Sequence, residues 1–241
     1  MTTQVLVSEV GPRDGLQSIR PIMPLEAKKA WIAAEAAAGV TEIEVGSFVP
    51  AKLLPQLADT AEVVAYARTI PGLTVAVLVP NLKGLERAQA AGAREIAVVL
   101  SATETMNRRN INMSLEQATE VSAQALNVAS AAGLRTRAYV AVAFDCPFEG
   151  EVPLDRVVDL ATRMIAEGAQ EVVIADTIGA ASPGMVRDRF RELVGVIPVE
   201  RLAAHFHDTR GMGAANAWAA IEAGVRRFDA SVGRIGGSPI A

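Results

Sequence analysis

A chain of 241 residues, of which 51% are hydrophobic and 21% charged, can bury one large core, so we expect a single domain over residues 1–241. The net charge of −4, with no basic run among aromatics, argues against a nucleic-acid partner and favours a small-molecule one. One cysteine excludes an internal disulfide, the start MTTQVLVSEVGPRDG lacks a signal-peptide layout, and no uncharged apolar run could span a membrane, so we expect a cytoplasmic protein.

Strand-like and helix-like segments alternate along the chain. Helical stretches such as residues 25–39 and 114–133 place apolar side chains at helical spacing and end in glycine. A strand follows each such glycine, and this order favours parallel βαβ units. Eight strands with seven intervening helices predict an α/β fold, the (β/α)₈ or TIM barrel. The β-branched runs that we interpret as strands cover residues 4–10, 41–46, 73–79, 95–101, 135–144, 171–177, 201–208 and 226–232.

The last predicted strand is followed only by GRIGGSPIA, which leaves no room for an eighth helix. Without that helix, apolar surface on the first and last strands would stay exposed, at a cost of roughly 25 cal/mol for each Å². We therefore expect that the barrel in this chain is incomplete at its C-terminal end and that the natural protein is longer.

The ends of the predicted strands carry polar residues. In barrels of this class the chemistry lies at the C-terminal ends of the strands, so these residues are expected to meet at one mouth. They are Glu9, Arg13 and Asp14 after the first strand, Glu44 and Ser47 on the second, Asp176 and Thr177 on the sixth, and His205, His207 and Asp208 on the seventh.

The only two histidines of the chain lie in HFHDTRG, residues 205–211. Residues two apart on a strand face the same side, so His205 and His207 can both point into the barrel while Phe206 packs against the helices. With Asp14 they could hold a divalent metal, Mg²⁺ or Mn²⁺, with Zn²⁺ as a further candidate. The alternative is a pair of hydrogen-bonded core histidines.

Several motifs together carry a family resemblance. They are EVGPRDGLQ, EIEVGSFVPAKLLPQLAD, NRRNIN, CPFEG, ADTIGAASPG, HFHDTRGMGAAN and FDASVGRIGGSPIA, and they extend over nearly the whole chain. In these motifs the chain resembles the 3-hydroxy-3-methylglutaryl-CoA lyases, within a metal-dependent barrel group that also contains isopropylmalate and homocitrate synthases.

The resemblance implies a carbon–carbon lyase that cleaves an acyl-CoA substrate by retro-Claisen chemistry to acetyl-CoA and a keto acid. It implies Asp14, His205 and His207 as metal ligands and Arg13 as the group that stabilises the enolate. A further ligand, an asparagine beyond the eighth strand, would follow Ala241. The residues assigned to the acyl-CoA site, besides Arg13, are Gln17, Arg20, Glu44, Ser47, Asp176 and Thr177.

The chain departs from this family at one position. Where the lyases carry a catalytic cysteine between GG and P, this sequence has Ser238. A thiol exchanges protons near neutrality and a hydroxyl does not, so Ser238, water or a residue beyond Ala241 would have to protonate the enolate. Asp14 or His205 is the candidate base, and Cys146 is interpreted as a structural residue.

Other interpretations of these residues and of the function stay open. Arg13 and Asp14 could form a surface ion pair, Glu44 could be a buried carboxylate that pairs with an arginine across the barrel, and Asp176 and Thr177 could cap the next helix. The alternative functions are a related lyase such as a citramalyl-CoA lyase, a condensing synthase, or a non-catalytic metal-binding paralogue. Apolar helix faces of this fold class often form dimers, so a homodimer is expected.

Overall fold

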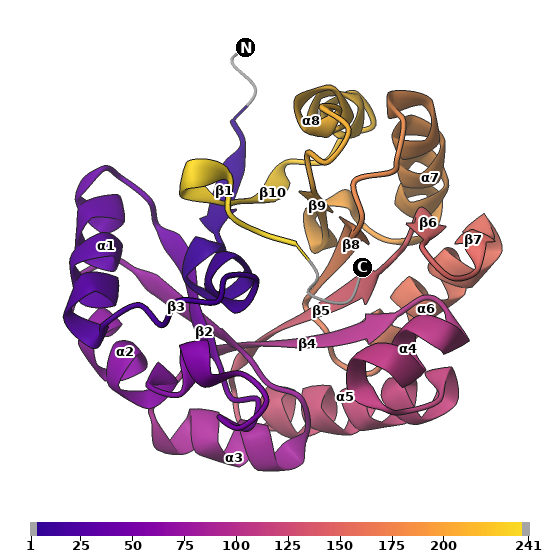
Figure 1. Ribbon diagram of the computed structural model, residues 1–241. Helices are drawn as coiled ribbons and strands as arrows, with labels where there is room; N and C mark the ends of the chain where they lie inside the picture. The colour runs from indigo at the N-terminus through magenta and orange to yellow at the C-terminus, as the bar shows by residue number, and fades with distance from the viewer. Residues whose placement is uncertain (1–3, 238–241) are drawn as a thin grey trace.

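The computed structural model describes residues 4–237, and its strands close into a barrel (Figure 1). Neighbouring strands are parallel and follow the order β1-β10-β9-β8-β5-β4-β3-β2 around the barrel. The predicted TIM barrel and all eight of its strands are thereby confirmed. The barrel strands are β1 (Leu6–Glu9), β2 (Glu42–Ser47), β3 (Thr74–Leu78), β4 (Glu95–Ser101), β5 (Arg135–Ala141), β8 (Glu171–Asp176), β9 (Leu202–Phe206) and β10 (Arg227–Ala230).

Helices surround the barrel on its outside (Figure 1). They connect consecutive strands as the repeated helix, glycine, strand order predicts. Their bounds are α1 (Leu25–Ala37), α2 (Thr60–Ala67), α3 (Leu82–Ala90), α4 (Glu104–Ile111), α5 (Leu115–Ala131), α6 (Leu154–Ala166), α7 (Pro183–Val196) and α8 (Gly213–Glu222), with short turns η1 (Gly11–Gly15), η2 (Pro55–Leu57), η3 (Val199–Arg201) and η4 (Val232–Arg234). No helix within residues 4–237 is long and apolar enough to cross a membrane.

The predicted fifth strand is too long. It ends at Ala141 because Val142 has a φ of 48°, which an extended strand does not allow. The chain then forms a small antiparallel hairpin of β6 (Asp145–Cys146) and β7 (Gly150–Glu151). Cys146 is buried there, with its sulfur 3.1 Å from the Thr103 hydroxyl, in keeping with a structural role.

The closing seam of the barrel joins the two ends of the chain. Strand β1 pairs with β10 over four residue pairs, from Leu6 with Arg227 to Glu9 with Ala230. The segment after β10 then crosses the middle of the barrel as it is viewed in Figure 1. This pairing brings residues after β1 beside residues of β9 and β10, although nearly the whole chain separates them in sequence.

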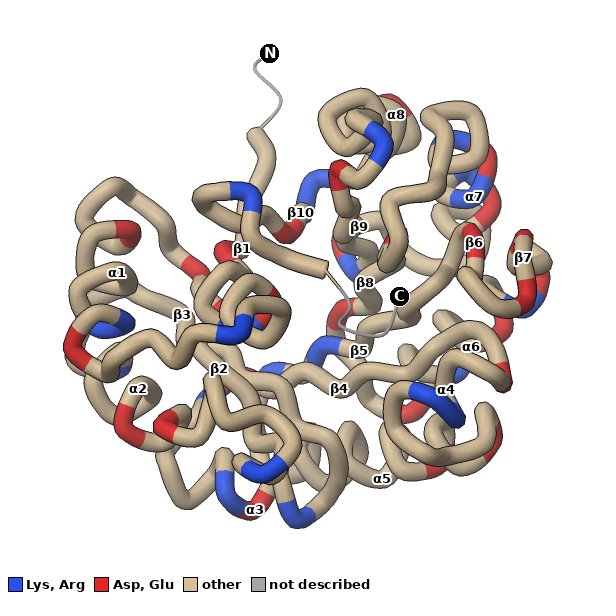
Figure 2. Tube along the Cα trace, viewed as in Figure 1, with Lys and Arg blue, Asp and Glu red and all other residues tan. Residues whose placement is uncertain are grey.

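The inside of the barrel differs from the layer between strands and helices. The outer layer is an extensive apolar core, whereas the apolar cluster inside is small and contains Ala97, Tyr139, Val173 and Ala203. Figure 2 shows blue and red segments mixed over the outer helices and further charged segments on the strands. Inside, buried Arg137 pairs with Glu171 at 2.7 Å and with Asp229 at 2.8 Å. The interior is therefore held by ion pairs as well as by apolar packing.

Candidate metal and acyl-group site

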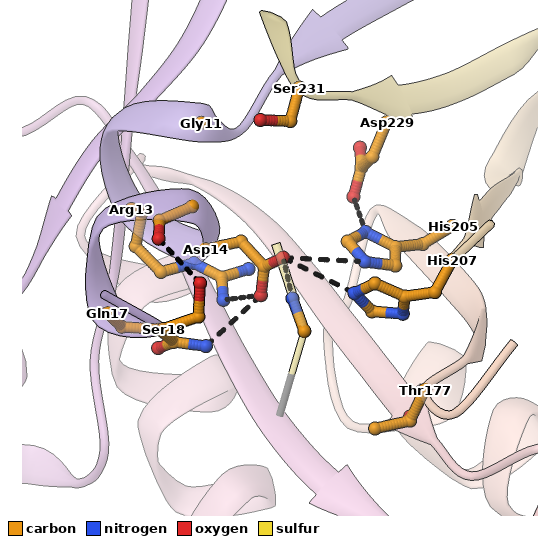
Figure 3. A network of polar contacts seen from close by, with 12 residues as sticks. Gly11, Arg13, Asp14, Gln17, Ser18, Thr177, His205, His207, Asp229 and Ser231 are labelled. Carbon is orange, nitrogen blue, oxygen red and sulfur yellow. Dashed lines mark hydrogen bonds and ion pairs between the residues drawn. The ribbon is translucent and has the colours of Figure 1, made fainter. Parts of the chain in front are cut away.

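The loop after β1 forms the turn η1, which carries Arg13 and Asp14 at the mouth (Figure 3). The backbone N–H groups of both residues donate to the Val10 carbonyl, at 3.0 and 2.7 Å. Each residue is only 6% exposed. The alternative of a surface ion pair is therefore wrong.

The three residues predicted as metal ligands lie together. The His207 Nε2 atom is 3.4 Å and the His205 Nε2 atom 4.0 Å from Oδ2 of Asp14. One ligand atom from each residue lies within 4.8 Å of the others, which is close enough for all three to reach one cation. Two imidazoles and a carboxylate are a donor set that binds divalent metals and leaves positions open for substrate or water. The residues present thus fit a metal ion.

The charges around this site influence each other. Burial raises the pKa of Asp14, but Arg13 and the two histidines outweigh burial and hold that pKa well below its usual range. Burial lowers the pKa of His207, but the hydrogen bond to Asp14, the charge of Asp14 and the contacts with Asp176 together outweigh burial, so the His207 pKa lies above its ordinary value. In the absence of metal, Asp14 is thus an ionised carboxylate, which is the form that a metal ligand requires.

The remaining ring nitrogen of each histidine contacts a hydrogen-bond acceptor. Nδ1 of His207 lies 3.0 Å from the Asp176 carbonyl oxygen, and Nδ1 of His205 lies 3.0 Å from Oδ2 of Asp229. Asp229 was missed in the sequence, although it occupies the middle of the eighth predicted strand in FDASV. A carboxylate in the middle of a predicted barrel strand, between Phe228 and Ala230, was the signal that could have identified it.

Arg13 connects the metal-ligand cluster to β2. Its Nε donates to Glu44 at 2.6 Å and its Nη1 to Asp14 at 3.0 Å, while its guanidinium carbon lies 5.5 Å from the centre of the Tyr139 ring. Glu44 is fully buried and pairs with an arginine, but the partner is Arg13, which follows the neighbouring strand β1, and not an arginine across the barrel. Among the described residues, Nη2 of Arg13 has no hydrogen-bond partner and stays available to a ligand.

The polar residues at the ends of β2 and β8 stabilise loops. The Ser47 hydroxyl accepts from the Val49 N–H at 3.2 Å, and the Thr177 hydroxyl accepts from the Val142 N–H at 2.7 Å. The Asp176 carboxylate accepts from two N–H groups of the following loop, those of Ala180 and Ala181. The alternative of helix capping by Asp176 or Thr177 is wrong, because Ser182 is the N-cap of α7.

The other predicted site residues have different surroundings. Gln17 donates to Oδ1 of Asp14 at 3.1 Å, whereas Arg20 is exposed. The Glu9 carboxylate accepts from the N–H groups of Gly11 and Val232, and Asp208 accepts from Gly213 at the start of α8. Ser238 lies outside the described residues.

The glycine-rich segment after β10 approaches the metal-ligand cluster closely. The Gly237 N–H donates to Oδ2 of Asp14 at 3.3 Å, and a Cβ atom on Gly236 would lie 2.9 Å from that oxygen. A cleft of about 940 Å³ opens here and is lined by Asp14, both histidines and this segment. The arrangement can bind a cation and present an oxygen-rich ligand to the Arg13 guanidinium.

Comparisons with known proteins agree over nearly the full chain. The family model described as HMGL-like matches residues 4–238. The hydroxymethylglutaryl-CoA lyase YngG of Bacillus subtilis is 41% identical over 238 residues, which are 99% of this chain and 80% of that protein. The 3-hydroxy-3-isohexenylglutaryl-CoA/hydroxymethylglutaryl-CoA lyase of Pseudomonas aeruginosa is 41% identical, over 99% and 79%. The structure of an HMG-CoA lyase from Acinetobacter baumannii, in complex with coenzyme A and 3-methylmalate, superimposes with a TM-score of 0.95 at 37% identity, covering 100% of this chain and 80% of that one.

Proposed function

Because the chain belongs to the HMGL-like family, we propose that it is a metal-dependent carbon–carbon lyase that cleaves 3-hydroxy-3-methylglutaryl-CoA or a closely related 3-hydroxyacyl-CoA. The observation that carries this proposal is the convergence of His205, His207 and Asp14 beside the buried Arg13. This combination supplies a cation site and a fixed positive charge at one mouth. Both stabilise a cleavage that develops negative charge next to a thioester.

The substrate is an acyl-CoA thioester with an oxygen-bearing acyl group. The relative from Acinetobacter baumannii, which was solved with coenzyme A and 3-methylmalate, supports this class. We assign Gln17, Arg20, Ser47, Asp176 and Thr177 to substrate binding, with Arg20 exposed at the rim and Gln17 against Asp14. The acyl group differs among relatives, since the Pseudomonas aeruginosa lyase is named for a 3-isohexenyl substrate besides the 3-methyl one.

Asp14, His205 and His207 would hold the cation, which we propose to be Mg²⁺ or Mn²⁺, with Zn²⁺ as the alternative. When bound, a divalent metal supplies Lewis acidity that polarises the substrate's 3-hydroxyl and orients the acyl group. Asp14 is the candidate to accept the hydroxyl proton through a water molecule, because His205 has no free nitrogen lone pair when its Nε2 binds the metal and its Nδ1 donates to Asp229. Loss of this proton breaks the bond between C2 and C3, which releases the keto acid and leaves the enolate of acetyl-CoA.

Arg13 stabilises the charge of the enolate. Glu44 and Asp14 hold its Nε and Nη1 atoms, which fixes the guanidinium before the reaction begins. A donor that is already oriented loses little in reorganisation when the thioester oxygen becomes negative. Glu44 is thus a positioning residue.

The enolate carbon must finally receive a proton. We assign this step to Ser238 or to a water near it, since Gly236 and Gly237 carry the chain to the metal ligands directly before Ser238. A serine hydroxyl transfers protons less readily than a thiol at neutral pH, so this step is expected to be slow. Replacing Ser238 by cysteine should therefore raise the rate.

The test measures acetoacetate release by the full chain from 3-hydroxy-3-methylglutaryl-CoA with Mg²⁺ or Mn²⁺, with and without EDTA. The proposed lyase activity is supported if EDTA abolishes the cleavage and if the His207→Ala variant does not cleave the substrate. The control variant Glu26→Gln, which changes an exposed residue, should cleave it as the unaltered protein does. If only the Ser238→Cys variant cleaves this substrate, the site of the unaltered protein is either specific for another substrate or catalytically inactive. If neither protein cleaves it, citramalyl-CoA is assayed next, and binding of Mn²⁺ without any turnover would indicate the non-catalytic paralogue.

We also propose how the chain assembles and where in the cell it is located. We infer a homodimer, since apolar side chains such as Trp218 on α8 are exposed on the helices, and sedimentation of the full chain measures this. A cytoplasmic location is proposed from the sequence, and cell fractionation tests it.

A further inference from the structure

Asp229 on β10 is the most completely paired carboxylate near the metal-ligand cluster. Its side chain is fully buried and receives three polar contacts. Oδ1 accepts from Nη2 of Arg137 at 2.8 Å, while Oδ2 accepts from the Tyr139 hydroxyl at 2.7 Å and contacts Nδ1 of His205 at 3.0 Å. Figure 3 shows Asp229 on the far side of the His205 ring from Asp14.

A carboxylate that pairs with a guanidinium only accepts hydrogen bonds, so the contact to His205 requires a proton on Nδ1 of that ring. The Nε2 atom then carries the free lone pair, and it is the atom that faces Asp14. His207 obtains the same tautomer from a backbone carbonyl, that of Asp176. The two rings therefore present their Nε2 atoms to one position, where both lone pairs are free for a cation once His207 gives up the proton that it shares with Asp14.

We propose that Asp229 is a positioning residue, held by Arg137 and Tyr139, which fixes the tautomer and orientation of His205 for metal binding. This inference rests on the proposed metal-dependent function. Acceptors behind ligand histidines increase the basicity of the ring and typically contribute about 10- to 100-fold to metal affinity. Behind His205 the acceptor is the buried carboxylate of Asp229, whereas behind His207 it is only the backbone carbonyl of Asp176.

The Asp229→Asn variant tests the proposal because the oxygen and the NH₂ group of the new amide side chain are not equivalent. The amide NH₂ cannot face the Arg137 guanidinium, so the carbonyl oxygen takes the Oδ1 position and the NH₂ group takes the place of Oδ2. That NH₂ donates to Nδ1 of His205, so the favoured tautomer of the neutral ring carries its proton on Nε2, which removes the metal-binding lone pair. His207 should keep its tautomer and serves as an internal reference.

The readout is the proton–nitrogen NMR correlation of the imidazole rings in metal-free protein, together with the Mn²⁺ dissociation constant measured by electron paramagnetic resonance. Only two histidines contribute signals, so both rings can be assigned. We expect protonated Nδ1 on both rings of the unaltered protein. In Asp229→Asn we expect protonated Nε2 on His205 and Mn²⁺ affinity weakened by about 10- to 100-fold.

Glu171→Gln is the matched control. It changes a second buried carboxylate on the same Arg137, at 2.7 Å from Nε, and Glu171 has no contact with either histidine. It should leave both the tautomers and the Mn²⁺ affinity unchanged. If Glu171→Gln weakens binding as much as Asp229→Asn, the effect is a general one of the ion-pair network and the proposal is wrong.

Two further results would overturn the proposal. One is a protonated Nε2 on His205 in the unaltered protein, which tests the inference even if the Asp229 variant does not fold. The other is a folded Asp229→Asn protein with unchanged ring signals and affinity. If the unaltered protein binds no Mn²⁺ and cleaves no thioester, the proposed function fails, whereas the ring tautomers still report on Asp229.

Discussion

At the residue scale, Gly236 shows how closely the segment after β10 approaches the metal ligands. A Cβ atom at this position would lie 2.9 Å from Oδ2 of Asp14 and 3.7 Å from Nε2 of His207. We predict that Gly236→Ala weakens Mn²⁺ binding by about 10-fold, because the methyl group occupies space that ligand and cation need. Calorimetric titration of the full chain with Mn²⁺ measures the change.

The control for this variant is Gly195→Ala. A Cβ atom there meets no atom within 4 Å, and Gly195 lies in α7 away from the mouth. It should bind Mn²⁺ as the unaltered protein does. Equal affinities for Gly236→Ala and Gly195→Ala would show that the segment moves aside freely.

At the element scale, Asn107 attaches α4 to the end of β4. Its fully buried amide accepts from the Ser101 N–H and donates to the carbonyls of Ser101 and Thr103. We predict that Asn107→Ala lowers the free energy of unfolding by at least about 2 kcal/mol, because it leaves buried backbone groups unpaired. Urea denaturation measures this, and exposed Asn110→Ala on the same helix should change stability little.

The carboxyl groups of Glu35 on α1 and Glu9 on β1 interact with each other. Burial and the charge of Glu9 raise the pKa of Glu35 from the ordinary 4.5 to about 7, and the Trp31 N–H also donates to Glu35. The native state then keeps the Glu35 proton up to about pH 7, whereas the unfolded chain releases it near pH 4.5. The contribution of protonated Glu35 to the free energy of unfolding is therefore lost as the pH rises from about 4.5 to about 7.

The Glu35→Gln variant should not show this pH-dependent loss of stability, because glutamine does not titrate. We predict that the variant gains stability relative to the unaltered protein as the pH rises through this window, as measured by urea midpoints at several pH values. Because burial also raises the pKa of Glu95 to about 7, the difference between the two proteins isolates Glu35. Glu26→Gln, an exposed change in the same helix, should show no such trend.

At the scale of the whole molecule, the predicted metal ligands span the seam that closes the barrel. Asp14 follows β1, whereas His205 and His207 come from the end of β9, two strands away across β10. A bound cation would link both sides of this seam. We predict that Mn²⁺ at 100 times its dissociation constant stabilises the fold by about 2.7 kcal/mol.

Thermal unfolding of the full chain measures this stabilisation. The melting temperature should rise with Mn²⁺ and return to its starting value after EDTA is added. Asp14→Asn should respond less, since it removes the charged ligand. A melting temperature that does not depend on Mn²⁺ would contradict a metal site at this position.

The sequence by itself determined the barrel, its eight strands and the grouping of Asp14, His205 and His207. These follow from local periodicity and from the rule that parallel strands present their carboxyl ends at one mouth. Only the tertiary structure decided that Glu44 pairs with Arg13 and that Asp229 contacts His205. Those contacts join strands whose partners depend on how the barrel closes, and the hydrophobic pattern of a strand does not encode which buried charge lies opposite.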